Sequence, residues 1–183
     1  MLRLSSALLI VALCCALTLA VIYYNTAPRI EEQKKMLLVR SLNSVLSAHR
    51  YERYENGMVY FEAYDKEGIV VGWCLSLKGK GYGGDINLLV GLDSSKNITG
   101  VKVLEHMETP GLGSQINEVK YGQEEAAFLS QFKGKVFKDI VLVKGETKGN
   151  IQAITGATVS SRAVVDEVHR GIEEFFKVKK IEP

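Results

Sequence analysis

The chain has 183 residues, with 23 basic and 21 acidic side chains and a formal net charge of +2. This near balance gives no bulk electrostatic case for binding nucleic acid. A hydrophobic content of 46% with only three prolines excludes a disordered chain and indicates a folded one. The length is enough for one domain of ordinary size plus a short extra segment.

The first segment of the chain is apolar. No charged residue occurs from Leu4 to Pro28, and nearly every side chain from Ala7 to Tyr24 is apolar. About 20 helical residues span a hydrocarbon core of about 30 Å. Tyr23 and Tyr24 end the run, as is typical of aromatic residues at a membrane interface. The pattern predicts a retained transmembrane anchor.

A cleaved signal peptide is the alternative for this segment. Thr18-Leu19-Ala20 is a mediocre cleavage site, and the apolar run is longer than a usual signal core of about 7–15 residues. A lipoprotein site is also poor, because Leu13 precedes Cys14 where a small residue is needed. The basic residues that flank the two ends of the run are nearly balanced, so the positive-inside rule leaves the orientation open.

The soluble part alternates between helical and strand-like patterns. Charged and apolar residues repeat at helical spacing from Arg29 to about Ser47, which predicts an amphipathic helix that follows the anchor. An Asp-Lys-Glu-Gly turn joins the first two strand-like runs into a hairpin. The expected strands are Met58–Tyr64, Ile69–Leu77, Asp85–Leu92, Ile98–Glu105 and Ile140–Val143, with helices at about Gln123–Gln131 and Val159–Lys177. We therefore expect an α+β domain with a mainly antiparallel sheet.

The last of these helices is amphipathic. Its spacing predicts burial of Val164, Val168, Ile172 and one of the pair Phe175 and Phe176.

The start of this helix is the most informative part of the chain. Ile154-Thr155-Gly156-Ala157-Thr158-Val159-Ser160-Ser161 places Thr158 at a helix N-terminus, where unpaired backbone N–H groups and a partial positive charge suit a phosphate. The alternative is an ordinary helix start in which one hydroxyl caps the N–H groups. Four hydroxyl side chains lie here, which is more than a single cap needs: Thr155, Thr158, Ser160 and Ser161.

Three loops are rich in glycine and hydroxyl residues, namely Gly79–Gly84, Glu108–Gly113 and Gly149–Thr158. Such loops allow a ligand to approach the backbone closely, but they also form plain turns. Pro110-Gly111 suits the two central positions of a type II turn. Each loop is a weak signal when taken alone.

Other kinds of site are not supported. Cys14, Cys15 and Cys74 show neither a CxxC pair nor zinc-type spacing, and we interpret them as small apolar fillers. The three histidines are scattered, and His169 is expected on a solvated face of the last helix. We assign no acid–base catalytic residue and no metal site.

Taken together, the motifs resemble one family. Gly81–Gly84, Val103–Gly113 and Ile154–Ser161, behind a single anchor, are similar to the G subunit of the Rnf electron-transport complex. The FMN-binding domain of that family also occurs in the C subunit of the sodium-pumping NADH:quinone reductase. The resemblance covers the anchor and nearly all of the soluble part.

The resemblance implies that FMN is attached by a phosphoester bond to Thr158 by a separate flavin transferase. It also implies a soluble domain on the extracytoplasmic side of the inner membrane, with the Gly81–Gly84 loop near the flavin. The other residues that it places around FMN are Thr155, Gly156, Ala157, Ser161, Glu108, Thr109, Pro110, Gly111 and Leu112. One position departs from the family pattern, because Gln152 stands where the flavinylation motif usually has an aspartate.

These implications give a division into three parts: a cytoplasmic tip and transmembrane anchor (1–28), an amphipathic linker helix (29–57) and an FMN-binding domain (58–183). The expected function is that of an electron-carrying flavoprotein subunit, without independent turnover, in an ion-translocating ferredoxin:NAD oxidoreductase. Its partners would be the other Rnf subunits, the flavin transferase and membrane lipid. The alternatives are a flavin-free, membrane-tethered interaction module, a stand-alone extracytoplasmic flavoprotein, and the FMN subunit of the quinone reductase.

Overall fold

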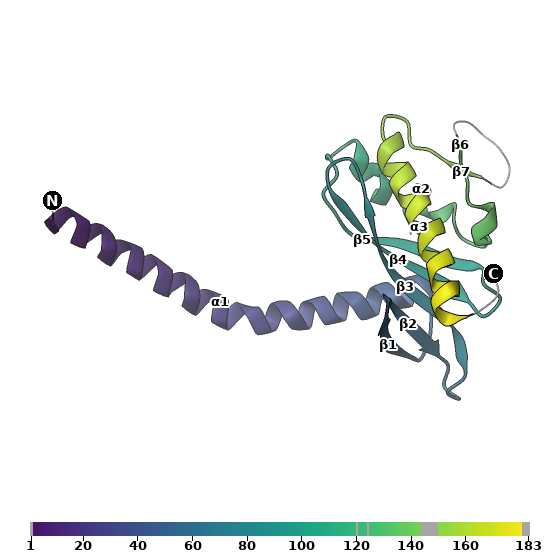
Figure 1. Cartoon of the computed structure of the whole chain (residues 1–183), viewed down its shortest axis with the longest axis horizontal. Helices are drawn as coiled ribbons and strands as arrows, with labels where there is room; N and C mark the ends of the chain where they lie inside the picture. Colours follow the sequence, from purple (N-terminus) through teal and green to yellow (C-terminus); the bar gives the residue numbers. More distant parts are fainter. Residues whose placement is uncertain (1, 120, 124, 144–149, 181–183) are drawn as a thin grey trace. The chain divides into compact units, whose positions relative to one another are not determined.

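The computed structural model describes residues 2–119, 121–123, 125–143 and 150–180. The chain divides into two compact units, residues 1–40 and 41–183 (Figure 1). The first unit consists of most of helix α1, which runs from Leu2 to Val45. The second unit holds the end of α1 and all of the remaining elements.

Helix α1 is continuous through Pro28. A proline removes one backbone hydrogen bond from a helix, and just before it Asn25 and Thr26 donate side-chain hydrogen bonds to backbone carbonyls one turn earlier, each at 2.8 Å. The expected anchor (1–28) and the helical part of the expected linker thus belong to one continuous helix. From Leu8 onward, α1 has the length and composition to cross a membrane, and its large apolar side chains up to Tyr24 are exposed.

Five strands form an antiparallel sheet in the order β1-β2-β3-β4-β5, so each strand pairs with its neighbour in the chain. Their bounds are β1 Arg50–Asn56, β2 Met58–Tyr64, β3 Val70–Lys80, β4 Asp85–Asp93 and β5 Ile98–His106. The predicted α+β class with a mainly antiparallel sheet is confirmed. Strand β1 is not among the predicted strands, since residues 50–56 fall within the expected linker helix (29–57).

The two outer strands of the sheet are protected differently. β1 is charged along its length, with an ion pair between Arg50 and Glu52 at 2.9 Å and another between Arg53 and Glu55 at 2.8 Å. At the other edge, the backbone of Ile98 in β5 exchanges hydrogen bonds with Gly134 and Lys135 at 2.7 and 2.9 Å. Charges and covering loops both discourage unwanted strand pairing.

Short elements connect β5 to the last helix. They are the 3-10 helices η1 (Gly113–Asn117) and η2 (Phe137–Asp139), helix α2 (Ala127–Ser130), and the parallel pair β6 (Leu142–Val143) and β7 (Ile151–Gln152). Helix α2 and strand β6 are shorter than the elements expected at Gln123–Gln131 and Ile140–Val143, and β7 was not expected. Glu124 of that expected helix and Gly149 of the expected loop lie outside the described residues.

Helix α3 (Thr158–Lys179) lies across one face of the sheet (Figure 1). Val164, Val168 and Ile172 are fully buried as predicted, and Phe175 and Phe176 are both buried rather than only one of them. The helix approaches β3 closely at Gly171, where a Cβ atom would overlap the side chain of Leu77. His169 is half-buried, and its ring lies 5.5 Å from that of Phe137, so the expectation of a solvated face was wrong.

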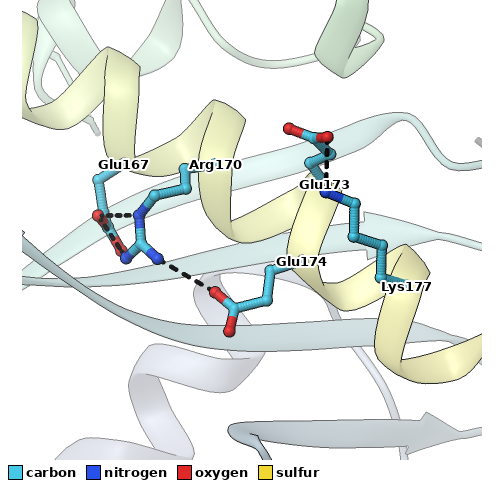
Figure 2. Close-up of polar contacts among 5 residues, drawn as sticks. All are labelled: Glu167, Arg170, Glu173, Glu174 and Lys177. Atoms are coloured by element: carbon cyan, nitrogen blue, oxygen red, sulfur yellow. Dashed lines mark hydrogen bonds and ion pairs between the residues drawn. The ribbon is translucent and has the colours of Figure 1, made fainter.

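Ion pairs within α3 join exposed side chains to one another and to the buried Glu167, as shown in Figure 2. Arg170 contacts Glu167 at 2.7 Å and Glu174 at 3.1 Å, and Lys177 contacts Glu173 at 2.8 Å. Pairs with this spacing stabilise a helix by only a few tenths of a kcal/mol each.

At the C-terminal end of α3, Lys179 pairs with the buried Glu62 of β2, which also accepts a hydrogen bond from Tyr64 at 2.8 Å. Burial opposes ionisation of Glu62, but these two partners hold the pKa of its carboxyl below the ordinary value. The pair joins the end of α3 to the sheet.

The opposite face of the sheet receives the end of α1. Leu42, Val45 and Leu46 are buried there, and Thr99 of β5 donates its hydroxyl to the carbonyl of Val45. Glycines make the approach feasible, because a Cβ on Gly91 would lie 2.6 Å from the carbonyl oxygen of Val45. The end of α1 therefore packs directly against the backbone of the sheet at these glycines.

We predict that Gly91→Ala lowers the free energy of unfolding by roughly 1–3 kcal/mol, because overpacking a tight contact has this cost. The matched control is Ser95→Ala, an exposed change in the neighbouring β4–β5 turn, expected within about 0.5 kcal/mol of the parent. Urea unfolding of the full chain in detergent, followed by fluorescence of the single tryptophan Trp73, measures both. Equal midpoints for the two variants would contradict this account of Gly91.

Candidate functional site

Three segments meet at one end of the sheet. They are the 81–84 loop between β3 and β4, residues 107–113 after β5, and the N-terminus of α3. Residue pairing brings the first two together, because Ile86 of β4 lies opposite His106 of β5. Between the three segments lies a pocket of about 400 Å³, lined by Tyr82, Glu108, Thr109, Leu112, Gly113, Gly156, Ala157, Thr158, Val159 and Ser160.

Six of the residues singled out from the sequence line this pocket, namely Glu108, Thr109, Leu112, Gly156, Ala157 and Thr158. Four do not. Pro110 and Gly111 form the exposed tip of a turn, Thr155 is exposed, and Ser161 is fully buried. The pocket also includes Tyr82, which belongs to the Gly81–Gly84 loop that the resemblance places near the flavin. Gly113, Val159 and Ser160 line it too and were not expected as ligands from the sequence, although Ser160 is one of the four hydroxyls noted there.

Helix α3 begins without a side-chain cap. Its N-cap residue is Ala157, and within the described ranges no side chain bonds to the N–H groups of the first turn. Those groups have no partner within the helix. Among the described residues no hydrogen-bond partner is found for the half-exposed Thr158 hydroxyl, and the interpretation of these hydroxyls as ordinary caps is wrong.

The two serines that follow serve other purposes. Ser161 donates its hydroxyl to the carbonyl of Ala157 at 2.9 Å and accepts a hydrogen bond from the N–H of Ile154 at 3.1 Å. Ser160 donates its hydroxyl to the carboxylate of Glu108. Of the four hydroxyls, those of Thr155 and Thr158 remain available to a ligand, and only Thr158 lines the pocket.

Two glycine turns shape the pocket wall. The turn predicted at Thr109–Leu112 is present, with a hydrogen bond from Leu112 N–H to Thr109 carbonyl at 3.2 Å and Gly111 at φ +75°. A similar turn precedes α3, where Ala157 N–H donates to the Ile154 carbonyl at 3.0 Å and Gly156 has φ +81°. Positive φ at the third residue of such a turn favours glycine. The Gly-Ala-Thr sequence thus determines the backbone conformation that places Thr158 at the start of α3.

Glu108 is buried at the centre of the site, with 6% of its surface exposed. One carboxylate oxygen accepts a hydrogen bond from Gly83 N–H at 2.9 Å, and the other accepts the Ser160 hydroxyl. Cβ atoms on Gly81 or Gly113 would overlap these oxygens. Glycine at both positions is therefore needed to accommodate the carboxylate.

Comparison with known proteins is consistent with this geometry. A model of the FMN-binding domain family matches residues 81–173, and a model of the RnfG N-terminal region matches residues 1–45. The G subunit of the proton-translocating ferredoxin:NAD(+) oxidoreductase complex of Clostridium ljungdahlii is 31% identical over 159 residues, which cover 85% of this chain and 81% of that protein. The chain belongs to the family of Rnf G subunits.

A second member of the family is more similar over a shorter span. The G subunit of an ion-translocating oxidoreductase complex from Methanosarcina acetivorans is 38% identical over 117 residues, 63% of this chain and 57% of that protein. FMN is the cofactor of this domain family, and all of the pocket-lining residues lie within the matched range.

Solved structures share the fold. NqrC of Shewanella oneidensis superposes with a TM-score of 0.51 at 30% identity, over 67% of this chain and 56% of that one. The C subunit of the Na(+)-translocating NADH-quinone reductase from Parabacteroides distasonis superposes with a TM-score of 0.54 at 26% identity, over 69% of this chain and 64% of that one. The Rnf G subunits and these proteins thus have a common FMN-binding fold.

We predict that Gly113→Ala disrupts the pocket wall, because its Cβ would lie 2.7 Å from the Ser160 hydroxyl oxygen and overlap Glu108. The matched control is Gly111→Ala. The added Cβ would meet no atom within 4 Å, so the only cost of this substitution is the backbone strain of a positive φ. That strain costs about 1–2 kcal/mol. Gly113 has no such strain, but its Cβ would overlap groups of both Glu108 and Ser160, so we expect a larger cost, at or above the upper end of the about 1–3 kcal/mol usual for overpacking. Thermal unfolding of both variants measures the difference, and an equal loss in Tm would contradict the steric assignment.

Proposed function

We propose that this chain is a membrane-anchored subunit that holds FMN covalently on Thr158 and carries electrons in an ion-translocating ferredoxin:NAD oxidoreductase complex. One observation supports it above the others. Thr158 has a hydroxyl with no partner among the described residues, and it stands in a pocket at a helix N-terminus that lacks a side-chain cap.

The residues present fit a flavin phosphate. Backbone N–H groups of the first turn of α3 and the partial positive charge of the helix end favour an anion at Thr158. The pocket volume of about 400 Å³ is within the usual range for cofactor sites of about 300–1,000 Å³. Tyr82, Leu112 and Val159 give the pocket apolar surface on which a flat ring can pack.

The protein would mainly position the cofactor. When bound, FMN supplies electron-transfer chemistry, and the chain supplies attachment, orientation and surroundings. A phosphoester at Thr158 prevents dissociation of the cofactor between redox cycles. Because Tyr82 and Val159 are largely exposed, at 77% and 54%, a flavin beside them would be accessible to partner subunits.

The partners follow from the named relatives, which are subunits of ferredoxin:NAD(+) or ion-translocating oxidoreductase complexes. The proposal includes a flavin transferase that attaches the cofactor. Gln152 has an exposed side chain, and its backbone is held by Gln131 through a 2.7 Å hydrogen bond from Gln152 N–H. The position is thus accessible to a maturation enzyme, although it lacks the carboxylate of the usual motif.

The predicted anchor is the apolar part of α1, which is long and apolar enough to cross a membrane and is not buried in the protein. An exposed apolar surface of this length requires a nonaqueous environment. We place the domain on the extracytoplasmic side of the inner membrane, as the family resemblance implies.

The attachment can be tested by mass. The full chain produced with the flavin transferase should gain about 438 Da, FMN less water, on the peptide that contains Thr158. Thr158→Ala should abolish the gain, and the control Ser95→Ala, which removes an exposed hydroxyl in the β4–β5 turn outside the pocket, should retain it. Intact mass followed by peptide mapping measures this.

Flavin that remains covalently bound to Thr158→Ala would refute the site. An unmodified parent chain with active transferase would point to Gln152, and a gain of mass in Gln152→Asp would then assign the loss to the missing carboxylate. Absence of flavin in both the parent chain and Gln152→Asp would favour the flavin-free interaction module.

Sidedness can be tested with an introduced thiol. Burial raises the pKa of the Cys74 thiol to about 12, so this side chain should not react in the folded protein, and Cys14 and Cys15 lie within the predicted span. In Ser95→Cys, the new thiol in the exposed β4–β5 turn should therefore be labelled by a membrane-impermeant maleimide in intact cells. The parent chain is the control for specificity, and lysed cells are the control for reactivity. Labelling only after lysis would place the domain in the cytoplasm.

A further inference from the structure

The buried carboxylate of Glu108 connects all three segments that form the pocket. It belongs to the segment after β5, accepts a hydrogen bond from Gly83 in the glycine loop, and accepts another from Ser160 in the first turn of α3. We call these two hydrogen bonds the Glu108 bridge. Along the chain, Glu108 lies 25 residues from Gly83 and 52 from Ser160. The pairing of β4 with β5 already holds Gly83 near Glu108, so the bridge adds a link from this end of the sheet to the first turn of α3.

The surroundings of the carboxylate are tight on both sides. Gly81 and Gly113 lie so close that a Cβ atom at either would overlap a carboxylate oxygen. A Cβ on Gly83 would overlap the carbonyl of Met107. The 81–84 loop and the 107–113 segment are therefore packed backbone to backbone around this side chain, which leaves it little freedom to turn towards a ligand.

The bridge also determines what the helix end offers to a phosphate. Glu108 uses the side-chain hydroxyl of Ser160 and the N–H of Gly83, and neither belongs to the backbone donors of the first turn of α3. A carboxylate at a helix N-terminus would otherwise compete with a phosphate for those donors. Here the two anions can be accommodated by separate sets of donors.

We propose that Glu108 is a positioning residue: the Glu108 bridge holds the glycine loop against the first turn of α3 and so fixes the wall of the FMN pocket, while the backbone N–H groups remain for the phosphate. The proposal rests on the proposed function of the site. It differs from a direct contact between Glu108 and the flavin, because both carboxylate oxygens are bonded to protein groups. The influence of Glu108 on the flavin passes through Gly83 and Ser160.

The first test uses the full chain in detergent without the transferase, and measures hydrogen exchange of the backbone amides in the 81–84 loop. Glu108→Ala should accelerate exchange at Gly83 about tenfold or more, because that amide loses a charged acceptor in a buried site. Glu108→Gln should stay within about threefold of the parent, because an amide can accept from Gly83 N–H and donate to the Ser160 oxygen. Ser160→Ala is a second variant that breaks one half of the bridge, and it should accelerate exchange less than Glu108→Ala.

The matched control is Glu105→Ala, which removes an exposed carboxylate three residues earlier in the same region and should leave the loop unchanged. Exchange at Gly83 that is equally fast in the parent and in Glu108→Ala would overturn the bridge. If Glu108→Ala fails to fold, the other two variants test the bridge. Exchange at Gly83 should then be faster than in the parent for Ser160→Ala and close to the parent for Glu108→Gln.

The second test uses the flavinylated chain and measures the fluorescence anisotropy of the flavin. A pocket wall released from α3 should leave the flavin more mobile, so anisotropy should fall in Glu108→Ala but not in Glu108→Gln or Glu105→Ala. Faster loop exchange with unchanged anisotropy would show that the bridge does not fix the flavin, and would refute the positioning role. If no variant carries flavin at all, the proposed function fails, whereas the exchange test still reports on the bridge.

Discussion

The contact between helix α3 and strand β3 determines where the cofactor site lies. Gly171 allows the helix backbone to approach Leu77, and the buried residues Val164, Val168 and Ile172 keep the helix against the sheet from there towards its start. Thr158 lies 13 residues before Gly171, or about 20 Å at the rise of an α-helix. Because a packed helix is rigid over that length, contacts far from the pocket fix the position of the Thr158 hydroxyl.

The two ends of α3 are held by different chemistry. Near the C-terminus, Lys179 pairs with the buried Glu62, and aromatic rings of Tyr60 and Phe175 meet at 5.3 Å. At the N-terminus, the only described carboxylate in the pocket wall is Glu108, which bonds to Ser160. Each end of α3 thus has an anionic partner. At the C-terminal end it is the carboxylate of Glu62, and at the N-terminal end it is the carboxylate of Glu108 and, in our proposal, the phosphate of the cofactor.

Much of this arrangement could be predicted from the sequence, and the exceptions have physical causes. β2 to β5 and α3 follow from clear patterns of apolar residues, because each buries one side against the core. β1 was missed because its tyrosines, Tyr51 and Tyr54, are three residues apart among charges, without the period of two that indicates a strand, and because this outer strand buries little. β7 has only two residues, and its parallel pairing with β6 depends on the fold around it.

The pocket shows the same division. Thr158 and the turn at Gly111 could be found from local sequence, since a helix start and a Pro-Gly turn are local features. The Glu108 bridge joins residues 52 positions apart, and no pattern within either segment indicates which serine the carboxylate contacts. Nor could the sequence show that Ser161 points inward while Thr158 faces the pocket, because this depends on the rotation of α3 about its axis.

The charged outer strand has a consequence for a protein confined to a membrane. Anchoring restricts copies to a plane, which raises their effective local concentration above that of a freely diffusing domain. An open five-stranded sheet would then meet other copies edge to edge, where unpaired backbone groups could form a shared sheet. The Arg50–Glu52 and Arg53–Glu55 pairs place charge along β1, and charged side chains on an outer strand disfavour pairing with the same edge of another copy.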